Sequence, residues 1–479
     1  MRLYIFAIGG TGARVLHSLT MLLASGVALT DEGGNKYELV PIIIDPDMQN
    51  GNVSHTEGVL QLYCTIQHEL DGVNAPRTSG FFNTKITSLN QIANNGQQQV
   101  QNNFLYGFAG ESQMKFRDFI NYNSLGHDFQ AFLQTIYSER NLDDTMEIGF
   151  KGNPNVGSVF LNNFQNSDEY QTFLSTFQAE KDRVFVIGSL FGGTGAAGMP
   201  LIVKTIRDDK KPTINGALIG ALAVMPYFNV QRPQGQSVDI DSSSFITKTK
   251  AALTYYHNNF NEPDAIFYIG DQLASNPYNY SIGATGQKND AHFIELAGAL
   301  SILQYGRMAD SKLAPPTRSP QSPSICLEFG IESDSLQVSF NDLGAPKKEI
   351  AKFLTSFYLY KFLHPQIKNS ESAWRKNIGL DSTHTGNLET FFAHFGTWLS
   401  QLSTNRRAFT PFNLSENRLT HIMSGYEVKS GFFSKFDTKT VETELTANSK
   451  NVTQTTAFQK YIDLASTTFL KICADKFKL

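Results

Sequence analysis

Two short glycine runs, each placed directly after an apolar stretch, are the residues in this sequence best suited to chemistry. The first is Gly9-Gly10-Thr11-Gly12, followed by Ala13 and Arg14. Residues 4–8 before it read as a buried strand, and a helical pattern follows it. Glycines let the backbone approach a phosphate closely, and the exposed N–H groups of a helix N-terminus favour an anion. The run predicts an anion-binding turn, with a tight turn that binds no ligand as the alternative.

The second run, Gly192-Gly193-Thr194-Gly195, has the same setting after the apolar stretch 184–190. Its glycines would leave several backbone amides unobstructed, and the Thr194 hydroxyl adds a donor. Such a nest of donors suits a triphosphate. The run is not a Walker A loop, because no Gly-Lys-Ser/Thr follows it. The first run is not a complete dinucleotide motif either, since Val15 stands where the third glycine belongs.

Asp45 ends the apolar stretch 39–44. An acid at this place contacts a ribose hydroxyl in Rossmann proteins. It can equally orient a loop, sit near a phosphate-bound metal or cap a turn, so Asp45 does not distinguish between these roles.

The elements that position these residues alternate between strand-like and helical patterns up to about residue 310. This alternation predicts an α/β fold built on a parallel sheet. The helical patterns follow Gly12, Gly198 and Ser242. The expected strands are Leu3–Ile8, Leu39–Ile44, Arg183–Ile187, Ala217–Met225 and Ala265–Ile269.

The pattern weakens in two places. Residues from about 50 to 180 are rich in Asn and Gln and are predicted to be a polar insertion, either a flexible surface loop or ordered loops around a ligand. Residues 314–324 carry four prolines without apolar periodicity. We therefore predict one domain over residues 1–310 and a C-terminal α+β domain over residues 311–479.

Composition narrows the class of protein. Hydrophobic residues make up 41% of the 479 residues and charged residues 18%, which indicates a folded globular protein. A formal net charge of -4 argues against direct nucleic-acid binding. The three cysteines are far apart and predict reduced thiols in a cytoplasmic protein. No apolar run is long enough to span a membrane.

The second glycine run resembles the signature of tubulin and FtsZ, whose core is Gly-Gly-Gly-Thr-Gly-Ser/Thr-Gly. Phe191 stands at the first glycine, and Ala196-Ala197-Gly198 departs from the rest. Met225-Pro226-Tyr227-Phe228 resembles the family loop whose Pro-aromatic pair lies near the ribose. The resemblance covers about the first 310 residues and is nearest to the divergent bacterial tubulin-like proteins.

This resemblance implies a Rossmann-like GTPase-type domain that holds GTP or GDP between the two glycine runs, with Mg²⁺ as a candidate companion ion. It also implies that copies of the chain stack head to tail into filaments. The stretch His292–Tyr305 is similar to the central helix that joins the two domains of the family. Asn289 before it is then the candidate reader of the base, and a helix N-cap is its alternative role.

Hydrolysis in this family needs an acidic loop from the neighbouring subunit. The nearest match is residues 337–343, which keep Phe340 and Asp342 but lack the Asn and the first Asp of the FtsZ pattern. Asp342 is therefore the candidate catalytic carboxylate, and a cap for the following helix is its alternative role. GTPase activity stays open at this point.

Two other functions remain. The first is a switch or scaffold in a multiprotein complex that binds a nucleotide without polymerising, and the altered acidic loop favours it. The second is a Rossmann-type oxidoreductase, which explains the first glycine run and Asp45 but gives Gly192–Gly195 no role.

Overall fold

The computed structural model describes most of the chain. Its described residues are 1–47, 49–71, 80–93, 104–106, 108, 111–147, 149–231, 244–272, 278–279, 288–313, 324–328, 336–380, 385–425 and 436–479. The Asn- and Gln-rich stretch 94–103, the proline-rich stretch 314–323 and the expected helix start at Ser242 lie outside these residues.

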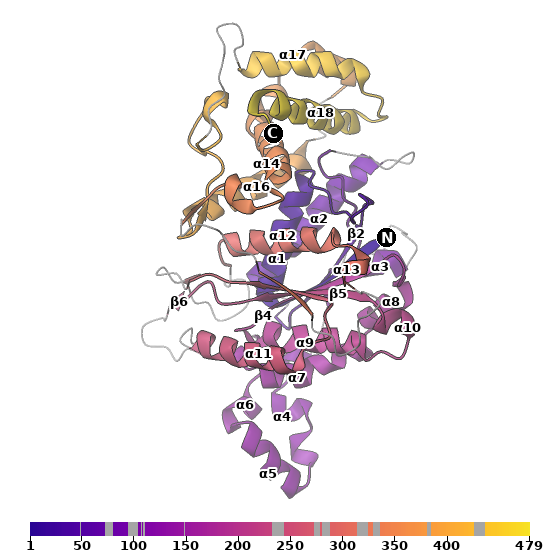
Figure 1. Cartoon of the computed structure of the whole chain (residues 1–479), viewed down its shortest axis with the longest axis vertical. Helices are drawn as coiled ribbons and strands as arrows, with labels where there is room; N and C mark the ends of the chain where they lie inside the picture. The colour runs from indigo at the N-terminus through magenta and orange to yellow at the C-terminus, as the bar shows by residue number, and fades with distance from the viewer. Residues whose placement is uncertain are drawn as a thin grey trace.

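A seven-stranded parallel sheet forms the centre of the molecule (Figure 1). Its strand order is β3-β2-β1-β4-β5-β7-β9. The expected strands are confirmed as β1, β2, β4, β5 and β7, and the α/β fold class with them. The strands are β1 (Arg2–Ile8), β2 (Glu38–Ile44), β3 (Leu105–Tyr106), β4 (Arg183–Ser189), β5 (Leu218–Val224), β7 (Ala265–Ile269) and β9 (Ile325–Glu328).

Helices cover both faces of this sheet. In β1, Leu3, Ile5 and Ala7 face the hydrophobic core on the side of α1 and α12, whereas alternate residues such as Phe6 face the core on the side of α9. Strands buried on both faces are apolar throughout, which is why they could be read from the sequence. The helices of this part are α1 (Gly9–Ala24), α2 (Gly51–Asp71), α3 (Leu89–Ala93), α4 (Phe116–Phe119), α5 (His127–Ile136), α6 (Glu139–Asp143), α7 (Pro154–Leu161), α8 (Asp168–Thr176), α9 (Gly193–Arg207), α10 (Pro212–Asn215), α11 (Phe245–Asn259), α12 (Phe293–Gly306) and α13 (Asp310–Leu313).

The described part of the predicted insertion, residues 50–180, is largely helical. Its first helix, α2, packs on α1 beside the sheet, and β3 adds a strand next to β2. Helices α4, α5 and α6 extend from the far side of the molecule, below α7 in Figure 1. The region therefore contributes to the core as well as to a projection.

The C-terminal part is built mainly of helices, which lie over α1, α2 and α12 (Figure 1). These helices are α14 (Lys347–Ile367), α15 (Ala373–Ile378), α16 (Gly386–Thr404), α17 (Thr438–Asn448) and α18 (Ala457–Phe477). The short strands β10 (Gln337–Val338) and β11 (Ala408–Phe409) pair in parallel, as do β6 (Val230–Gln231) and β8 (Tyr278–Asn279). The central sheet itself continues past residue 310, because β9 pairs with β7.

No helix within the described ranges is both long enough and apolar enough to cross a bilayer. The three cysteines are free, with Cys64 and Cys473 buried and Cys326 exposed.

Candidate functional site

Both glycine runs lie where the order of the sheet reverses. From β1 the chain proceeds outward to β2 and β3, and from β4 it proceeds in the opposite direction to β5 and β7. Strands β1 and β4 are neighbours, and each ends in one of the glycine runs. In open parallel sheets, ligands bind outside the carboxyl ends of the strands at this reversal. The topology therefore brings the two runs to the usual place for a ligand.

Each glycine run is the first turn of a helix, so the helices begin earlier than the sequence suggested. Helix α1 begins at Gly9 and α9 at Gly193, whereas we expected them after Gly12 and Gly198. Glycine is needed in these first turns because each helix packs closely on the strand before it. A Cβ atom on Gly12 would lie 2.7 Å from the carbonyl carbon of Ala7, and one on Gly195 would lie 2.5 Å from the backbone nitrogen of Ser189. Only glycine fits either position.

The two helix N-termini lie against each other. A Cβ atom on Gly9 would lie 3.4 Å from the Cβ of Thr194 and 3.6 Å from the backbone nitrogen of Gly195. Neither helix has a side-chain cap or an acidic residue in its first turn. Two uncapped N-termini side by side combine the positive ends of two helix dipoles with N–H groups that lack helical partners. This arrangement attracts an anion.

The second run is more covered than expected. Gly192 is half-buried, and Gly193, Thr194 and Gly195 are buried. A Cβ atom on Gly193 would lie 2.1 Å from the carbonyl oxygen of Gly149, so the turn Gly149–Gly152 rests directly on this glycine. The expected open nest of amides is therefore partly closed by this turn.

The covering turn has an unusual backbone. All four of its residues have positive φ, from 50° to 73°, and two of them, Phe150 and Lys151, are not glycine. Non-glycine residues rarely adopt this conformation, and each costs roughly 1–3 kcal/mol. The ring of Phe150 is buried against Phe160, and the ammonium of Lys248 donates to the carbonyl of Gly152 at 2.9 Å. These contacts hold the turn on the second run.

The loop after β2 borders the first glycine run. Asp45 is buried, and its carboxylate accepts the backbone N–H of Asp47 at 2.9 Å. Burial, with the nearby charge of Asp47, raises the pKa of Asp45 to about 7. The side-chain nitrogens of Asn50 and Asn52 would each lie 3.7 Å from a Cβ on Gly10. Polar and acidic groups therefore lie beside the first glycine run.

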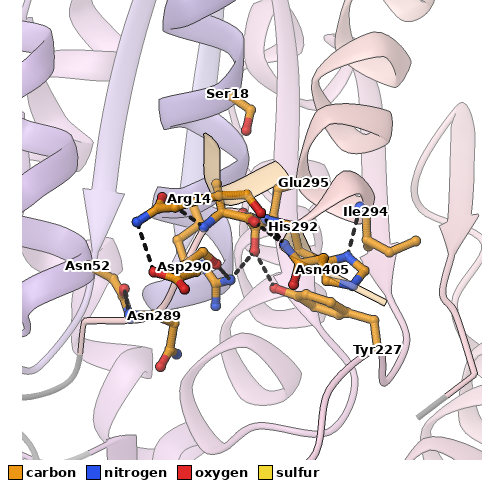
Figure 2. A network of polar contacts seen from close by, with 12 residues as sticks. Arg14, Ser18, Asn52, Tyr227, Asn289, Asp290, His292, Ile294, Glu295 and Asn405 are labelled. Atoms are coloured by element: carbon orange, nitrogen blue, oxygen red, sulfur yellow. Dashed lines mark hydrogen bonds and ion pairs between the residues drawn. The ribbon is translucent and has the colours of Figure 1, made fainter. Parts of the chain in front are cut away.

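A buried polar network joins the first run to the start of α12, and Figure 2 shows it at close range. The guanidinium of Arg14 forms an ion pair with Glu295 and donates to the carbonyl of Asp290 at 2.8 Å. The hydroxyl of Tyr227 donates to Glu295 at 2.8 Å. His292 is the N-cap of α12 and forms a capping box with Glu295. Arg14 thus connects the glycine turn to the central helix.

Asn289 lies beside this network without capping α12, because His292 is the cap. Its backbone N–H donates to the side-chain oxygen of Asn52 at 2.9 Å (Figure 2). Pro226 is buried after β5, and its carbonyl accepts the N–H of Asp271 at 3.4 Å. The structure therefore places the start of the expected base-reading segment next to the first glycine run.

Asp342 lies in a short 3₁₀ turn, Phe340–Leu343, rather than at the start of α14. Its carboxylate accepts the backbone N–H and the hydroxyl of Ser339, each at 2.7 Å. Asp342 thus caps its own turn, and α14 begins after Pro346 without its help.

Several residues of the site had no signal in the sequence. Asn52 and Glu295 look like ordinary helix residues when read locally, whereas Tyr227 belongs to the segment Met225–Phe228 that the sequence had already singled out. The turn Gly149–Gly152 falls in the region that we read as a polar insertion. Asn50 and Asn52, which follow Asp45 and Asp47 closely, were the only local hint of a polar site in this loop.

Within the described ranges, no group of three or more His, Cys, Asp and Glu side chains is arranged to hold a metal ion.

Comparisons with known proteins give only distant likenesses. No family model matches the chain, and no curated protein matches it. Among solved structures it is similar to CetZ2 from Haloferax volcanii in a GTPgS-bound protofilament, with 11% identity, a TM-score of 0.29 and coverage of 65% of this chain and 61% of that one. For CetZ from Methanosaeta thermophila strain DSM 6194 the values are 13%, 0.24, 56% and 46%. For TubZ-Bt in a two-stranded filament they are 10%, 0.26, 68% and 57%.

The chain thus spans roughly half to three-fifths of the length of these solved chains. TM-scores this low carry no argument about function. They also do not bear on the resemblance to bacterial members, which comes from the sequence motifs. What the structure itself establishes is an α/β fold with a parallel sheet and two glycine turns at its point of reversal.

Proposed function

We propose that this chain binds the phosphates of a nucleotide at the two adjoining helix N-termini that follow β1 and β4. The observation that carries the proposal is the contact between the two glycine runs, with Gly9 placed against Thr194 and both helices uncapped. A helix N-terminus binds anions through its N–H groups and its dipole, and here two act on one space. If the chain were a Rossmann-type oxidoreductase, the N-terminus of α9 would have no role.

We propose further that the nucleotide is GTP or GDP, with Mg²⁺ beside its phosphates. Guanine is supported by the resemblance of Gly192–Gly195 to the tubulin and FtsZ signature, and by the position of Asn289 near the first run. The acidic loop after β2 supports a hard cation, because Asp45 and Asp47 supply the oxygen ligands that Mg²⁺ prefers.

Self-assembly is the next part of the proposal. Head-to-tail stacking would bring the Asp342 loop of one subunit to the nucleotide of the next, where a positioned carboxylate can orient water for hydrolysis. This part rests on the sequence resemblance, as does the division into a nucleotide-binding part, 1–310, and a C-terminal part. A cytoplasmic location is supported by the three free thiols.

The experiment compares two substitutions at Gly10. This residue is half-buried, its φ is not positive, and a Cβ there would meet no atom closer than 3.7 Å. Gly10→Glu places a negative charge at the proposed phosphate site, and Gly10→Gln adds the same bulk without charge. An acid in the first turn of a helix does not harm folding, since it complements the dipole. The matched pair therefore separates charge at the site from loss of fold.

Each protein is purified natively and denatured, and the released nucleotide is measured by anion-exchange chromatography and then by titration with Mg-GTP and Mg-ATP. We expect wild type to release or bind guanine nucleotide, and Gly10→Glu to bind it at least tenfold more weakly than Gly10→Gln does. A wild-type protein that is empty and ignores both nucleotides would sink the proposal. Equal binding by the Glu and Gln variants would show that the phosphates do not bind at Gly10.

A nucleotide-binding switch or scaffold that does not polymerise is the second candidate. Two observations favour it: the turn Gly149–Gly152 covers the second glycine run, and the carboxylate of Asp342 is held by Ser339. Light scattering as a function of protein and GTP concentration separates the two candidates. Scattering that rises above a critical concentration only with GTP supports filaments, and its absence in a protein that binds GTP supports the switch.

A further inference from the structure

A cavity lies next to Arg14, two residues beyond the first glycine run. It has a volume of about 270 Å³ and is lined by α1, α2, α16, the start of α12 and the residues that lead into it. Helix α16 belongs to the C-terminal part, and it packs against α2. The cavity is therefore shared between the glycine-bearing sheet and the C-terminal helices.

The cavity continues along α1 from the anion site. Gly10, Arg14 and His17 are spaced at i, i+4 and i+7, so they lie on one face of the helix. Arg14 and His17 line the cavity, which thus reaches about 10 Å from Gly10 at 1.5 Å of rise per residue. Asn52 marks the entrance, since its side chain lies beside Gly10 and accepts the N–H of Asn289.

Three histidines from three helices line the cavity. The ring of His55 on α2 lies 4.9 Å from that of His17 on α1 and 5.1 Å from that of His394 on α16, measured between centroids. His17 is 7% exposed, and its buried Nε2 has no hydrogen-bond partner among the described residues. A buried polar atom without a partner is costly.

These imidazoles are uncharged at neutral pH. Burial lowers the pKa of His55 to about 4 and that of His17 well below its usual value, and His394 shifts in the same direction. The charged groups that face them are Lys288 and Arg14, which oppose protonation further. A neutral imidazole offers one donor, one acceptor and a flat ring.

The other charges at the cavity do not change this picture. The carboxylate of Glu295 is ion-paired with Arg14, and Lys288 is exposed. Apart from Lys288 and the Arg14–Glu295 pair, the lining is polar and uncharged, with imidazole and carboxamide groups such as those of Asn52 and Gln401. Such a lining suits an uncharged heteroaromatic ring with N–H and carbonyl groups. It suits phosphates poorly, because phosphates placed in the cavity would lose their interaction with the N-termini of α1 and α9.

We propose that the base of the bound nucleotide enters this histidine-lined cavity and packs against His55 and His394. This inference rests on the proposed function, and it adds that α16 contacts the ligand. The volume of the cavity agrees with this proposal. Pockets for whole drug-sized ligands measure roughly 300–1,000 Å³, so a cavity of 270 Å³ suits only the nucleoside end of the nucleotide. Binding then ties the C-terminal helices to the glycine-bearing sheet.

The test compares GTP with inorganic triphosphate, both with Mg²⁺, by titration calorimetry. Inorganic triphosphate reports on the glycine runs alone. We expect His55→Leu and His394→Leu to weaken GTP binding at least tenfold and to leave triphosphate binding within twofold of wild type. His55→Phe keeps the flat ring and should recover part of the loss. His257→Leu changes an exposed histidine of α11 and should alter neither affinity.

A second readout is hydrogen exchange of α16 in the wild-type protein. GTP should slow exchange over Gly386–Thr404, and inorganic triphosphate should not. Thermal unfolding without ligand checks that each variant is folded. If GTP binds wild type and both leucine variants equally, or if both ligands protect α16 to the same extent, the base lies elsewhere and the proposed function still stands. If wild type binds neither ligand, the proposed function fails and the inference fails with it.

Discussion

Gly9 and Thr194 are distant in the sequence, but a Cβ atom on Gly9 would lie only 3.4 Å from the Cβ of Thr194. The contact exists because β1 and β4 are adjacent and parallel, so their following turns emerge side by side. Each turn alone is an ordinary strand-to-helix connection. Together they form one site with two helix N-termini, which is the physical basis of the proposed phosphate binding.

The glycines that seat each helix on its strand should not tolerate a methyl group. In Gly12→Ala and Gly195→Ala the new Cβ would lie 2.7 Å or less from backbone atoms of β1 or β4, which cannot move independently of the sheet. We expect each variant to lose about 1–3 kcal/mol of unfolding free energy, the usual range for overpacking. Urea denaturation measures the loss.

Gly58→Ala is the control for this comparison. Gly58 lies on α2, is exposed, and has no atom within 4 Å of its Cβ position. Alanine there should stabilise the protein by about 0.5–1 kcal/mol through helix propensity. Loss of stability in the control as large as that in the test variants would contradict the packing argument.

Gly193→Ala should displace the turn that covers the second glycine run. Its Cβ would lie 2.1 Å from the carbonyl oxygen of Gly149, which is shorter than any real contact. Because the turn Gly149–Gly152 already has a strained backbone, it should yield before α9 does. We expect trypsin to cleave after Lys151 several times faster than in wild type.

Gly10→Ala is the matched control, because it alters the first run where a Cβ has room. Mass spectrometry of a tryptic time course gives the rate at each site. Unchanged cleavage after Lys151 in Gly193→Ala would mean that the turn is not held by this contact.

The parts of the fold that could be read from the sequence are those with a local cause. Strands such as β1 and β4 are buried on both faces and form continuous apolar runs, whereas β3 at one edge of the sheet is short and has no such signature. Helix starts were placed too late because glycine disfavours helices, and only the contact of Gly12 with Ala7 shows why it is needed.

In the candidate site, too, only the residues with a local cause could be predicted from the sequence. The glycine runs carry their own signal, because strand, turn and helix are contiguous. The histidine-lined cavity has none, since His17, His55 and His394 come from three helices, one of them in the C-terminal part. Only the packing of α1, α2 and α16 brings them together, and packing between distant segments cannot be read from spacing alone.

The buried ion pair of Arg14 and Glu295 should show strong coupling. Glu295→Leu leaves the Arg14 guanidinium buried without its carboxylate, which typically costs about 3–5 kcal/mol. The double variant Arg14→Met/Glu295→Leu removes both charges and should recover most of that loss. Tyr227→Phe removes one hydrogen bond to Glu295 and should cost about 1–3 kcal/mol. Urea denaturation of wild type, Arg14→Met, Glu295→Leu and the double variant completes the cycle. Additive losses from the two single changes would contradict a direct pair.

Asp45 should make the stability of the protein depend on pH. Burial raises the pKa of this carboxyl from 3.8 to about 7, so the folded chain binds its proton more tightly than the unfolded chain between these values. Stability from this group is therefore fully present below about pH 4 and declines as pH rises toward 7. Three pKa units set an upper limit of about 4 kcal/mol.

Asp45→Asn keeps an oxygen to accept the N–H of Asp47 and removes the charge. In EDTA, where no divalent cation can neutralise the carboxylate, urea denaturation at half-unit steps from pH 4.5 to 8 should show a shallower decline for this variant. Above pH 7 it should be more stable than wild type. Asp208→Asn, at an exposed position, should follow the wild-type curve. If Asp45→Asn also declines in parallel with wild type, the buried carboxyl of Asp45 does not titrate in this range.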